Sequence, residues 1–204
     1  MGALLVSKFQ YPDLSTGSTL LEVEKIRRNI WLELNNYLTP LEQIRIVTGI
    51  LYSYYNLKGT EVNYAEVNEF LIHKVLESKR GNQVGNGLLY LLICELLDIP
   101  VRAIGIPKQF VLAYFKPGYS DEQTDDYQSK IDFYIDPLSG MAFTHQDLHQ
   151  YFKRIQVQPV PTYFKPLPNK RVIQHLLEEV AKCFDNEKEG YKRDELRNLG
   201  ELLD

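Results

Sequence analysis

The side chains that could act as a nucleophile, a base or a metal ligand are few in this chain and far apart. His145 and His149 are four residues apart, a spacing that can hold a metal ion on a helix. The glutamate of the H-E-x-x-H pattern is replaced by Gln146, however, and no third ligand follows. A solvated helix face beginning after Thr144 explains the spacing more simply, so no metal site is expected.

The two cysteines, Cys94 and Cys183, have no paired spacing and therefore indicate neither a disulfide framework nor a zinc site. Cys94 lies in the apolar run 91–97, where a free cysteine ordinarily packs as a small hydrophobic side chain. Cys183 stands next to Phe184 on a predicted helix and has the same interpretation. Neither thiol is predicted to be a nucleophile.

Hydrophobic periodicity predicts the elements that position these groups. Three segments with helical spacing precede a long apolar helix, which ends before Pro100. Thr39, Pro40 and Glu42 form a helix start, with threonine as the cap and proline in the first turn. Short runs rich in β-formers then predict strands. The expected helices are 19–37, 39–59, 65–78, 79–98, 170–184 and 192–203, and the expected strands are 101–106, 110–115 and 131–135.

Two further segments divide the second half of the chain. Residues 118–127 are polar and acidic, which predicts a loop between strands that could act as a flap over a pocket. Residues 159–168 contain four prolines, which predicts a linker leaving the core domain. The two helices after this linker amount to one helical pair. Because repeat arrays need three or more units, the pair is expected to pack on the core.

Composition excludes several classes of protein. The net charge of −4 and the pI of about 5.6 argue against a nucleic-acid-binding surface. No apolar run is long enough to span a membrane, and residues 1–8 lack a full signal-peptide core. Apolar residues make up 44% of the 204, which is enough for a sizeable core. We therefore expect a soluble, cytoplasmic protein that binds neither nucleic acid nor membrane and carries no cofactor.

Three motifs in a fixed order resemble the transglutaminase-like superfamily. They are Tyr11-Pro12-Asp13-Leu14, the segment from Asn68 to Gly81, and Ile135-Asp136-Pro137. The closest resemblance is to a bacterial branch in which tetratricopeptide repeats follow the core and whose members are often described as regulators of expression. It implies an α+β fold: a papain-like core with an N-terminal helical subdomain (1–80), a core helix with a small antiparallel sheet (81–165), and a C-terminal helical pair (166–204).

The resemblance also implies where a catalytic triad would lie. The nucleophilic cysteine of the superfamily aligns with Gln83, the base histidine with Gln109, and the acid with Asp136. A carboxamide forms no nucleophilic anion and cannot relay a proton as an imidazole does. Cys94 is eleven residues along the same helix, about 16 Å away, and cannot take over the role of the missing thiol. The chain is expected to be a catalytically inactive member.

Three kinds of function remain open from the sequence. Asn82, Gln83, Asn86, Tyr90, Gln109 and Asp136 could form a polar pocket for an amide, a peptide or a carboxylate, or they could bond to one another and seal the old site. A hydrolase or acyl transferase with an unrecognised nucleophile is the enzymatic alternative. A scaffold that captures a protein partner through the helices of residues 170–203 is the third. A protein or peptide partner fits the first and the last.

Overall fold

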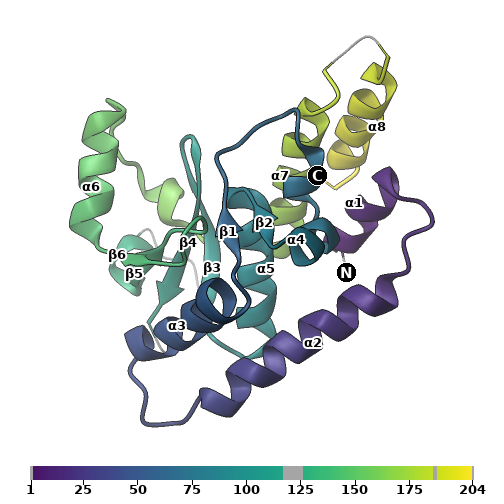
Figure 1. Cartoon of the computed structure of the whole chain (residues 1–204). Coiled ribbons are helices and arrows are strands. Elements are labelled where there is room, and N and C mark those ends of the chain that lie inside the picture. The colour runs from purple at the N-terminus through teal and green to yellow at the C-terminus, as the bar shows by residue number, and fades with distance from the viewer. Residues whose placement is uncertain (1, 117–125, 186–187, 204) are drawn as a thin grey trace.

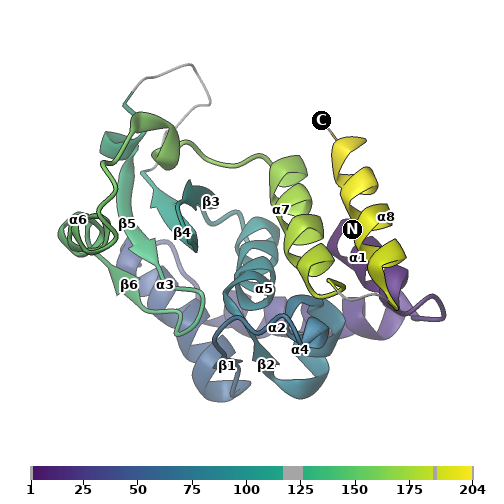
Figure 2. The ribbon, with the colours of Figure 1, turned by 90° about the horizontal axis from the view of Figure 1, so that it is seen from above.

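The sheet lies at the centre of the fold, between two layers of helices. In the computed structural model, the described residues are 2–116, 126–185 and 188–203, so the loop and flap expected at 118–127 lie almost entirely outside them. Figures 1 and 2 show α6 on one side of the sheet and α5 with α7 on the other. The N- and C-termini lie near each other on the α7–α8 side (Figure 2). The expected α+β class is confirmed.

Four antiparallel strands form this sheet in the order β3-β4-β5-β6. Along β4, Phe110 and Leu112 face one core cluster, while Val111 and Ala113 face the other. Alternation of this kind buries both faces of the strand, because successive side chains point to opposite sides. The three predicted strands are confirmed, and the short β6 was missed. The strands are β3 (Val101–Ile106), β4 (Gln109–Phe115), β5 (Ile131–Ile135) and β6 (Ala142–Phe143).

The N-terminal third is helical, as expected, with one additional helix. The predicted cap at Thr39 is present as a capping box, in which the threonine side chain and Glu42 bond to each other's backbone N–H. The helix that follows changes into a π-helical turn at Gly49 and ends before the predicted Gly59. The elements are α1 (Gly2–Gln10), which was not predicted, α2 (Thr16–Glu33), α3 (Pro40–Thr48), η1 (Gly49–Tyr54) and β1 (Lys58–Gly59).

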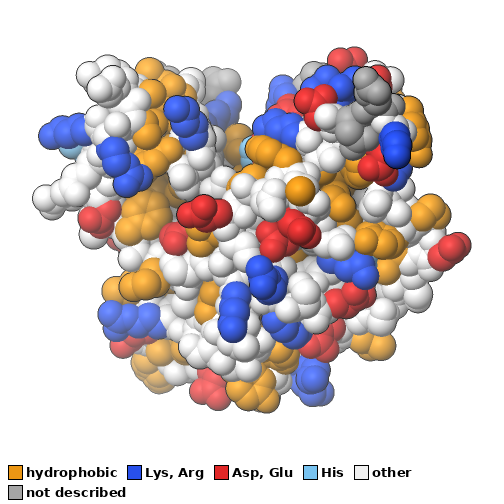
Figure 3. Space-filling model, turned by 45° about the horizontal axis from the view of Figure 1, so that its top comes forward, with side chains coloured by type: hydrophobic (Ala, Val, Ile, Leu, Met, Phe, Trp, Pro, Cys, Tyr) orange, Lys and Arg blue, Asp and Glu red, His pale blue; other side chains and the backbone are white. Residues whose placement is uncertain are grey.

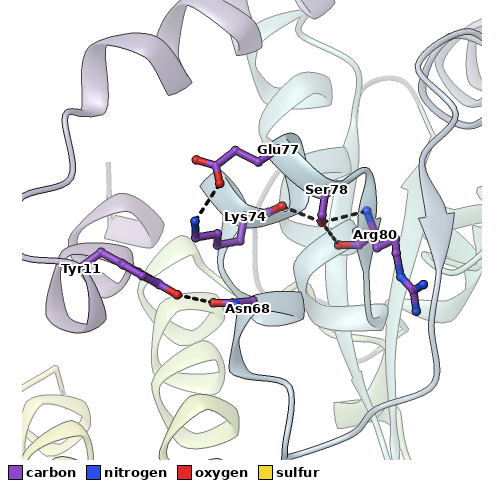
Figure 4. Close-up of polar contacts among 6 residues, drawn as sticks. All are labelled: Tyr11, Asn68, Lys74, Glu77, Ser78 and Arg80. Atoms are coloured by element: carbon purple, nitrogen blue, oxygen red, sulfur yellow. Dashed lines mark hydrogen bonds and ion pairs between the residues drawn. The ribbon is translucent and has the colours of Figure 1, made fainter.

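The single helix predicted for 65–78 is wrong, because the segment is broken at Leu71. The backbone there is extended (φ −93°, ψ 117°), and the carbonyl of Glu69 accepts a hydrogen bond from the N–H of Asn82, not from a following helical turn. Ser78 is the last residue of the second helical segment, and its side chain hydrogen-bonds to the backbone of Lys74 and Arg80 (Figure 4). The pieces are η2 (Val67–Phe70), α4 (Ile72–Ser78) and β2 (Arg80–Gly81), which pairs in parallel with β1.

Two of the resemblance motifs meet in this region. The hydroxyl of Tyr11 donates to Oδ1 of Asn68 at 2.7 Å, and Lys74 lies over the Tyr11 ring while pairing with Glu77 (Figure 4). Segments almost sixty residues apart in sequence are thereby joined at the base of α4. Behind Tyr11, the ring of His73 is packed edge-on at 5.1 Å between centroids.

His73 predicts a loss of stability in mild acid. Its side chain is 2% exposed, neither ring nitrogen has a hydrogen-bond partner among the described residues, and burial lowers its pKa. The unfolded chain therefore binds a proton more readily below about pH 6.5, and the free energy of unfolding falls there. Urea denaturation at pH 7.5 and 5.5 should show a smaller fall for His73→Leu than for the wild type. Equal falls would contradict this.

The linker and the C-terminal helices stay on the core. The N–H of Leu167 donates to the carbonyl of Ala103 at 2.8 Å, and Pro166 forms a bridge with Ile104, so the linker covers the free edge of β3 where it was expected to leave the domain. Helix α7 contributes to the same core cluster as α5, as expected for a pair that packs on the core. The elements are α5 (Gln83–Leu96), α6 (His145–Arg154), η4 (Pro161–Phe164), α7 (Asn169–Lys182) and α8 (Gly190–Glu201).

Candidate functional site

Gln83 is the first residue of α5 and lies against the start of β4. Asn82 caps the helix, its Oδ1 accepting from the backbone N–H groups of Val84 at 3.0 Å and Gly85 at 3.1 Å. The Oε1 of Gln83 accepts a hydrogen bond from the backbone N–H of Phe110 at 3.4 Å. The carboxamide is thus bonded to the backbone of β4, the strand that begins at Gln109.

Close contact between α5 and β4 depends on a glycine. A Cβ added to Gly87 would lie 2.7 Å from the ring of Phe110 and 3.4 Å from Pro137. The absence of a side chain at this position lets the helix approach both the strand and the turn after β5. The N-terminus of α5 is therefore held close to the start of β4.

Gln109 and Asp136 line one cavity of about 330 Å³ between the sheet and α6. Gln109 is exposed at the start of β4 and lines the cavity together with Tyr151, whose hydroxyl donates to the carbonyl of Pro107 at 2.8 Å. Arg154, one turn behind, lies over the Tyr151 ring and lines the same cavity. Burial raises the pKa of Tyr151, so the hydroxyl stays protonated as a hydrogen-bond donor.

Asp136 is occupied by its own turn. Its Oδ1 accepts from the N–H of Leu138 at 3.0 Å, and its Oδ2 accepts from the hydroxyl of Ser139 at 2.7 Å. The turn is anchored from outside by Thr48, which donates to the carbonyl of Gly140 at 2.7 Å. Gly140 has φ of +69°, and an added Cβ would lie 2.6 Å from the ring of Tyr52, so both the backbone and the space favour glycine there. Asp136 thus organises a turn at the edge of the cavity.

Three of the six expected ligand-binding residues have no surface open to a ligand. Asn82, Asn86 and Tyr90 are each 0% exposed. Asn86 donates to the carbonyl of Lys58 at 3.4 Å, and the hydroxyl of Tyr90 lies 3.1 Å from that of Thr48. Their polar groups hold α5 against β1 and α3. We therefore leave them out of the site and keep Gln109 and Asp136, which line the cavity. Gln83 is not among the residues that line it and contacts the site only through its bond to the backbone of Phe110.

A second cavity, of about 430 Å³, lies on the other side of the β3–β4 hairpin, against α7. Gln109 and Phe110 line both cavities, so the hairpin stands between them. We call the two cavities together the hairpin cleft. Figure 3 shows a corresponding notch in the surface between the lobe of α6 and the lobe of α7 and α8, with hydrophobic side chains at its base.

His175 is the site residue that sequence reasoning missed. Its ring lines the α7 cavity and stacks on Phe110, with centroids 5.3 Å apart and planes 3° from parallel. Burial lowers the pKa of His175, although Glu178 and Glu179 oppose this effect. No local motif marks this residue, because its neighbours at the site are some 65 positions earlier in the chain.

The remaining candidate groups lie outside the cleft. His145, expected on a solvated face, is half-buried instead: Nδ1 lies 3.0 Å from the hydroxyl of Tyr134, and Nε2 lies 3.1 Å from the carbonyl of Ile131. His149 is exposed. The predicted cap at Thr144 is confirmed. Within residues 2–116, 126–185 and 188–203, no three His, Cys, Asp or Glu side chains are grouped to hold a metal.

Both thiols are disfavoured as nucleophiles by their surroundings. Cys94 is 0% exposed in the core, and burial raises its pKa well above the usual range. Cys183 is half-buried on the turn after α7, and burial, helped by Glu179, raises its pKa to about 12. A thiol with a raised pKa contains almost no thiolate at neutral pH.

None of the helices in the described ranges has the length and apolarity needed to cross a membrane.

Comparison with known proteins identifies the family. A family model described as "Transglutaminase-like superfamily" matches residues 18–178, from the beginning of α2 into α7. No curated protein and no solved structure matches the chain significantly. The matched region contains the helix start at Gln83, the strand start at Gln109, the turn at Asp136 and the part of α7 that bears His175. The chain belongs to the transglutaminase-like superfamily.

Proposed function

We propose that this protein is a catalytically inactive member of its superfamily and that the hairpin cleft binds a peptide or a small amide-bearing ligand. The observation that carries the proposal is the state of Gln83. The position that would bear the nucleophile holds a carboxamide, and its oxygen is bonded to the backbone N–H of Phe110 at 3.4 Å. A side chain used in this way supports the strand and has no electron pair basic enough to attack a carbonyl.

The partner positions support the same conclusion. Gln109 offers an amide where general-base chemistry needs an imidazole, and Asp136 directs both oxygens at its own turn. His175 brings an imidazole to the cleft, but its ring lies flat on Phe110 and no described thiol accompanies it. Because triad members act as a unit, one remaining acid sustains almost none of the rate.

The cleft has the composition of a binding site. Each cavity falls within or near the range of about 300–1,000 Å³ that is typical of ligand pockets. Apolar side chains such as Phe143 and Leu148 line the α6 cavity beside the amide of Gln109 and the hydroxyl of Tyr151. An amide can both donate to and accept from a peptide group, which fits an amide-bearing ligand. We also propose that the helical pair α7 and α8 corresponds to the tetratricopeptide repeats that follow the core in the bacterial branch.

Reagents that label reactive nucleophiles test the proposal that the protein is catalytically inactive. Iodoacetamide at pH 7.5 should leave Cys94 and Cys183 unmodified in the folded chain and should label both in urea, because unfolding removes the burial that raises their pKa values. A fluorophosphonate should likewise label no hydroxyl. Mass spectrometry of digested protein gives the readout. Rapid, stoichiometric labelling of one residue in the native state would overturn the proposal.

A further inference from the structure

Arg154 is the one cation among the described residues that line the α6 cavity. It is the last residue of α6 and is exposed, and its guanidinium lies over the ring of Tyr151, 5.5 Å from the centroid. None of the ion pairs between described residues includes Arg154. An aromatic ring attracts a cation without neutralising it, so the N–H groups at the edge of the guanidinium stay available to an anion.

A second cation stands at the tip of the β3–β4 hairpin. Lys108 is exposed, and it too belongs to none of the ion pairs in the part of the chain that the structure describes. It follows Pro107 in the two-residue turn of the hairpin, and the carbonyl of Pro107 accepts from the hydroxyl of Tyr151 at 2.8 Å. The turn that carries Lys108 is therefore held on the same tyrosine that lies under Arg154.

Lys108 is kept in a backbone conformation that suits glycine. Its φ is +62°, in the left-handed region, where an L side chain meets steric strain. Strained residues of this kind cluster at ligand-binding sites, where the surrounding structure fixes a functional group in place. A glycine at this position would remove the strain. The lysine therefore lowers the stability of the fold, and a ligand that binds its ammonium group explains why it is there.

The neutral part of the cavity can hold an amide and an aliphatic side chain. Gln109 follows Lys108 and is exposed, with a donor and an acceptor on its carboxamide. Leu138 and Phe143 are half-buried and line the same cavity, so a ligand can contact them without any change in the core. A negative charge next to an amide and an aliphatic side chain is the chemistry of the C-terminal residue of a peptide.

Two carboxylates in the cavity limit this ligand to one negative charge. Asp147 accepts from the N–H and the hydroxyl of Thr144 at 2.8 and 2.7 Å, and seven residues of helix, about 10.5 Å along the axis, separate it from Arg154. Asp136 directs its oxygens at its own turn. Because like charges repel, the carboxylate of a ligand belongs at the Arg154 end, and a second anion beside Asp136 and Asp147 is disfavoured.

We propose that the α6 cavity binds the C-terminal residue of a peptide: Arg154 and Lys108 bind its carboxylate, Gln109 bonds to its last peptide group, and its aliphatic side chain lies on Leu138 and Phe143. This proposal rests on the proposed function, since it names the ligand class of one part of the hairpin cleft. Inorganic phosphate shares the negative charge but has neither the amide nor the side chain, so it should bind more weakly than the peptide.

Isothermal titration calorimetry with the full chain at pH 7.5 tests the ligand class. N-acetyl-Ala-Leu carries a carboxylate as its only charge and should bind. Its C-terminal amide should bind at least about tenfold more weakly, because the charge is gone. Equal binding of the two forms would overturn the proposal, as would the absence of heat and of any thermal shift with N-acetyl-Ala-Leu at millimolar concentration. Inorganic phosphate that binds as tightly as the peptide would show a site for anions alone and would also overturn it.

Neighbouring charges on α6 provide a matched pair of variants. Arg154→Gln should weaken binding of N-acetyl-Ala-Leu about tenfold and leave binding of its amide unchanged, because the guanidinium contacts only the carboxylate. Lys153→Gln removes the same charge from the adjacent exposed residue, which is not among those that line the cavity, and should leave both affinities unchanged. If the two variants bind N-acetyl-Ala-Leu equally well, Arg154 does not bind the carboxylate and the proposal is wrong.

Variants of Lys108 separate its charge from its strain. Lys108→Gly should raise the melting temperature by about 2–4 °C, because glycine adopts a left-handed φ without strain, and should weaken binding of N-acetyl-Ala-Leu about threefold to tenfold. Lys108→Ala loses the same ammonium group and keeps the strain, so it should weaken binding equally without a rise in melting temperature. A Lys108→Gly protein that is more stable and binds the peptide like the wild type would contradict the proposal.

The two proposals fail in distinguishable ways. If N-acetyl-Ala-Leu does not bind but the native protein resists iodoacetamide and fluorophosphonate, only the peptide assignment is wrong. If either probe labels a native residue, the proposal of inactivity is wrong, and the affinities of N-acetyl-Ala-Leu and its amide still decide the ligand class. Mass spectrometry of the incubated peptide then shows whether the protein cleaves it.

Discussion

The double variant Gln83→Cys, Gln109→His is expected to contain a thiol that is alkylated at neutral pH. Residue 83 is the first residue of α5, where the helix dipole favours an anion, and β4 meets it at Phe110, one residue after position 109. Cysteines at helix N-termini beside a histidine have pKa values of roughly 3.5–7.5, against ~8.5 for a free thiol. The pH dependence of iodoacetamide alkylation measures the shift.

Single variants separate the two contributions to that shift. Gln83→Cys alone keeps the helix terminus and lacks the imidazole, so its thiol pKa should lie between that of the double variant and ~8.5. The natural thiols do not interfere, because burial raises the pKa of both Cys94 and Cys183. A thiol pKa near 8.5 in a folded double variant would show that position 83 does not lie at a triad site and that the family alignment around Gln83 and Gln109 is misplaced.

Gly85→Ala is expected to destabilise the fold by about 3 kcal/mol, at the upper end of the cost of over-packing. An added Cβ would lie 2.2 Å from the carbonyl oxygen of Glu69 and 3.0 Å from Val75. The clash is with a backbone carbonyl, which cannot rotate away as a side chain can. The same carbonyl accepts a hydrogen bond from the N–H of Asn82, so a shift of Glu69 that removed the clash would break the bond that holds the start of α5. The melting temperature should fall by about 6–12 °C.

Gly200→Ala is the matched control for this prediction. Gly200 lies in α8, and an added Cβ would have no atom within 4 Å. Because alanine loses less backbone entropy in a helix, this variant should be more stable than the wild type by about 0.5–1 kcal/mol. Differential scanning calorimetry of both variants gives the comparison. A Gly85→Ala protein as stable as Gly200→Ala would mean that α5 and η2 are not in contact as described.

Elements with strong local signals were predicted correctly from the sequence. Thr39 and Thr144 each begin a helix with a capping box, because the cap and its partner three residues later form a local hydrogen-bonded unit. The strands at 101–106 and 131–135 follow from short runs of β-formers, and β4 begins one residue before its predicted start at 110. The order of the family motifs fixed the superfamily, which the match to residues 18–178 supports independently.

The features that the sequence did not predict depend on contacts between residues far apart in the chain. The segment 65–78 has helical spacing throughout, yet Glu69 is drawn into a bond with Asn82, and the helix breaks at Leu71. Asn86 and Tyr90 are polar residues close to Gln83 in sequence, but helical geometry points them into the core. Sequence proximity to a site did not mean proximity in space, because residues on one helix face different sides every few positions.

The sequence by itself determined the superfamily and the α+β class, because these depend on residue identity and local order. Only the tertiary structure decided what surrounds Gln83, Gln109 and Asp136. Folding places α7 against the β3–β4 hairpin, brings His175 onto Phe110 and divides the cleft into two cavities that share Gln109. These contacts join segments some 65 residues apart, and they form because α7 must bury its apolar stripe on the shared core.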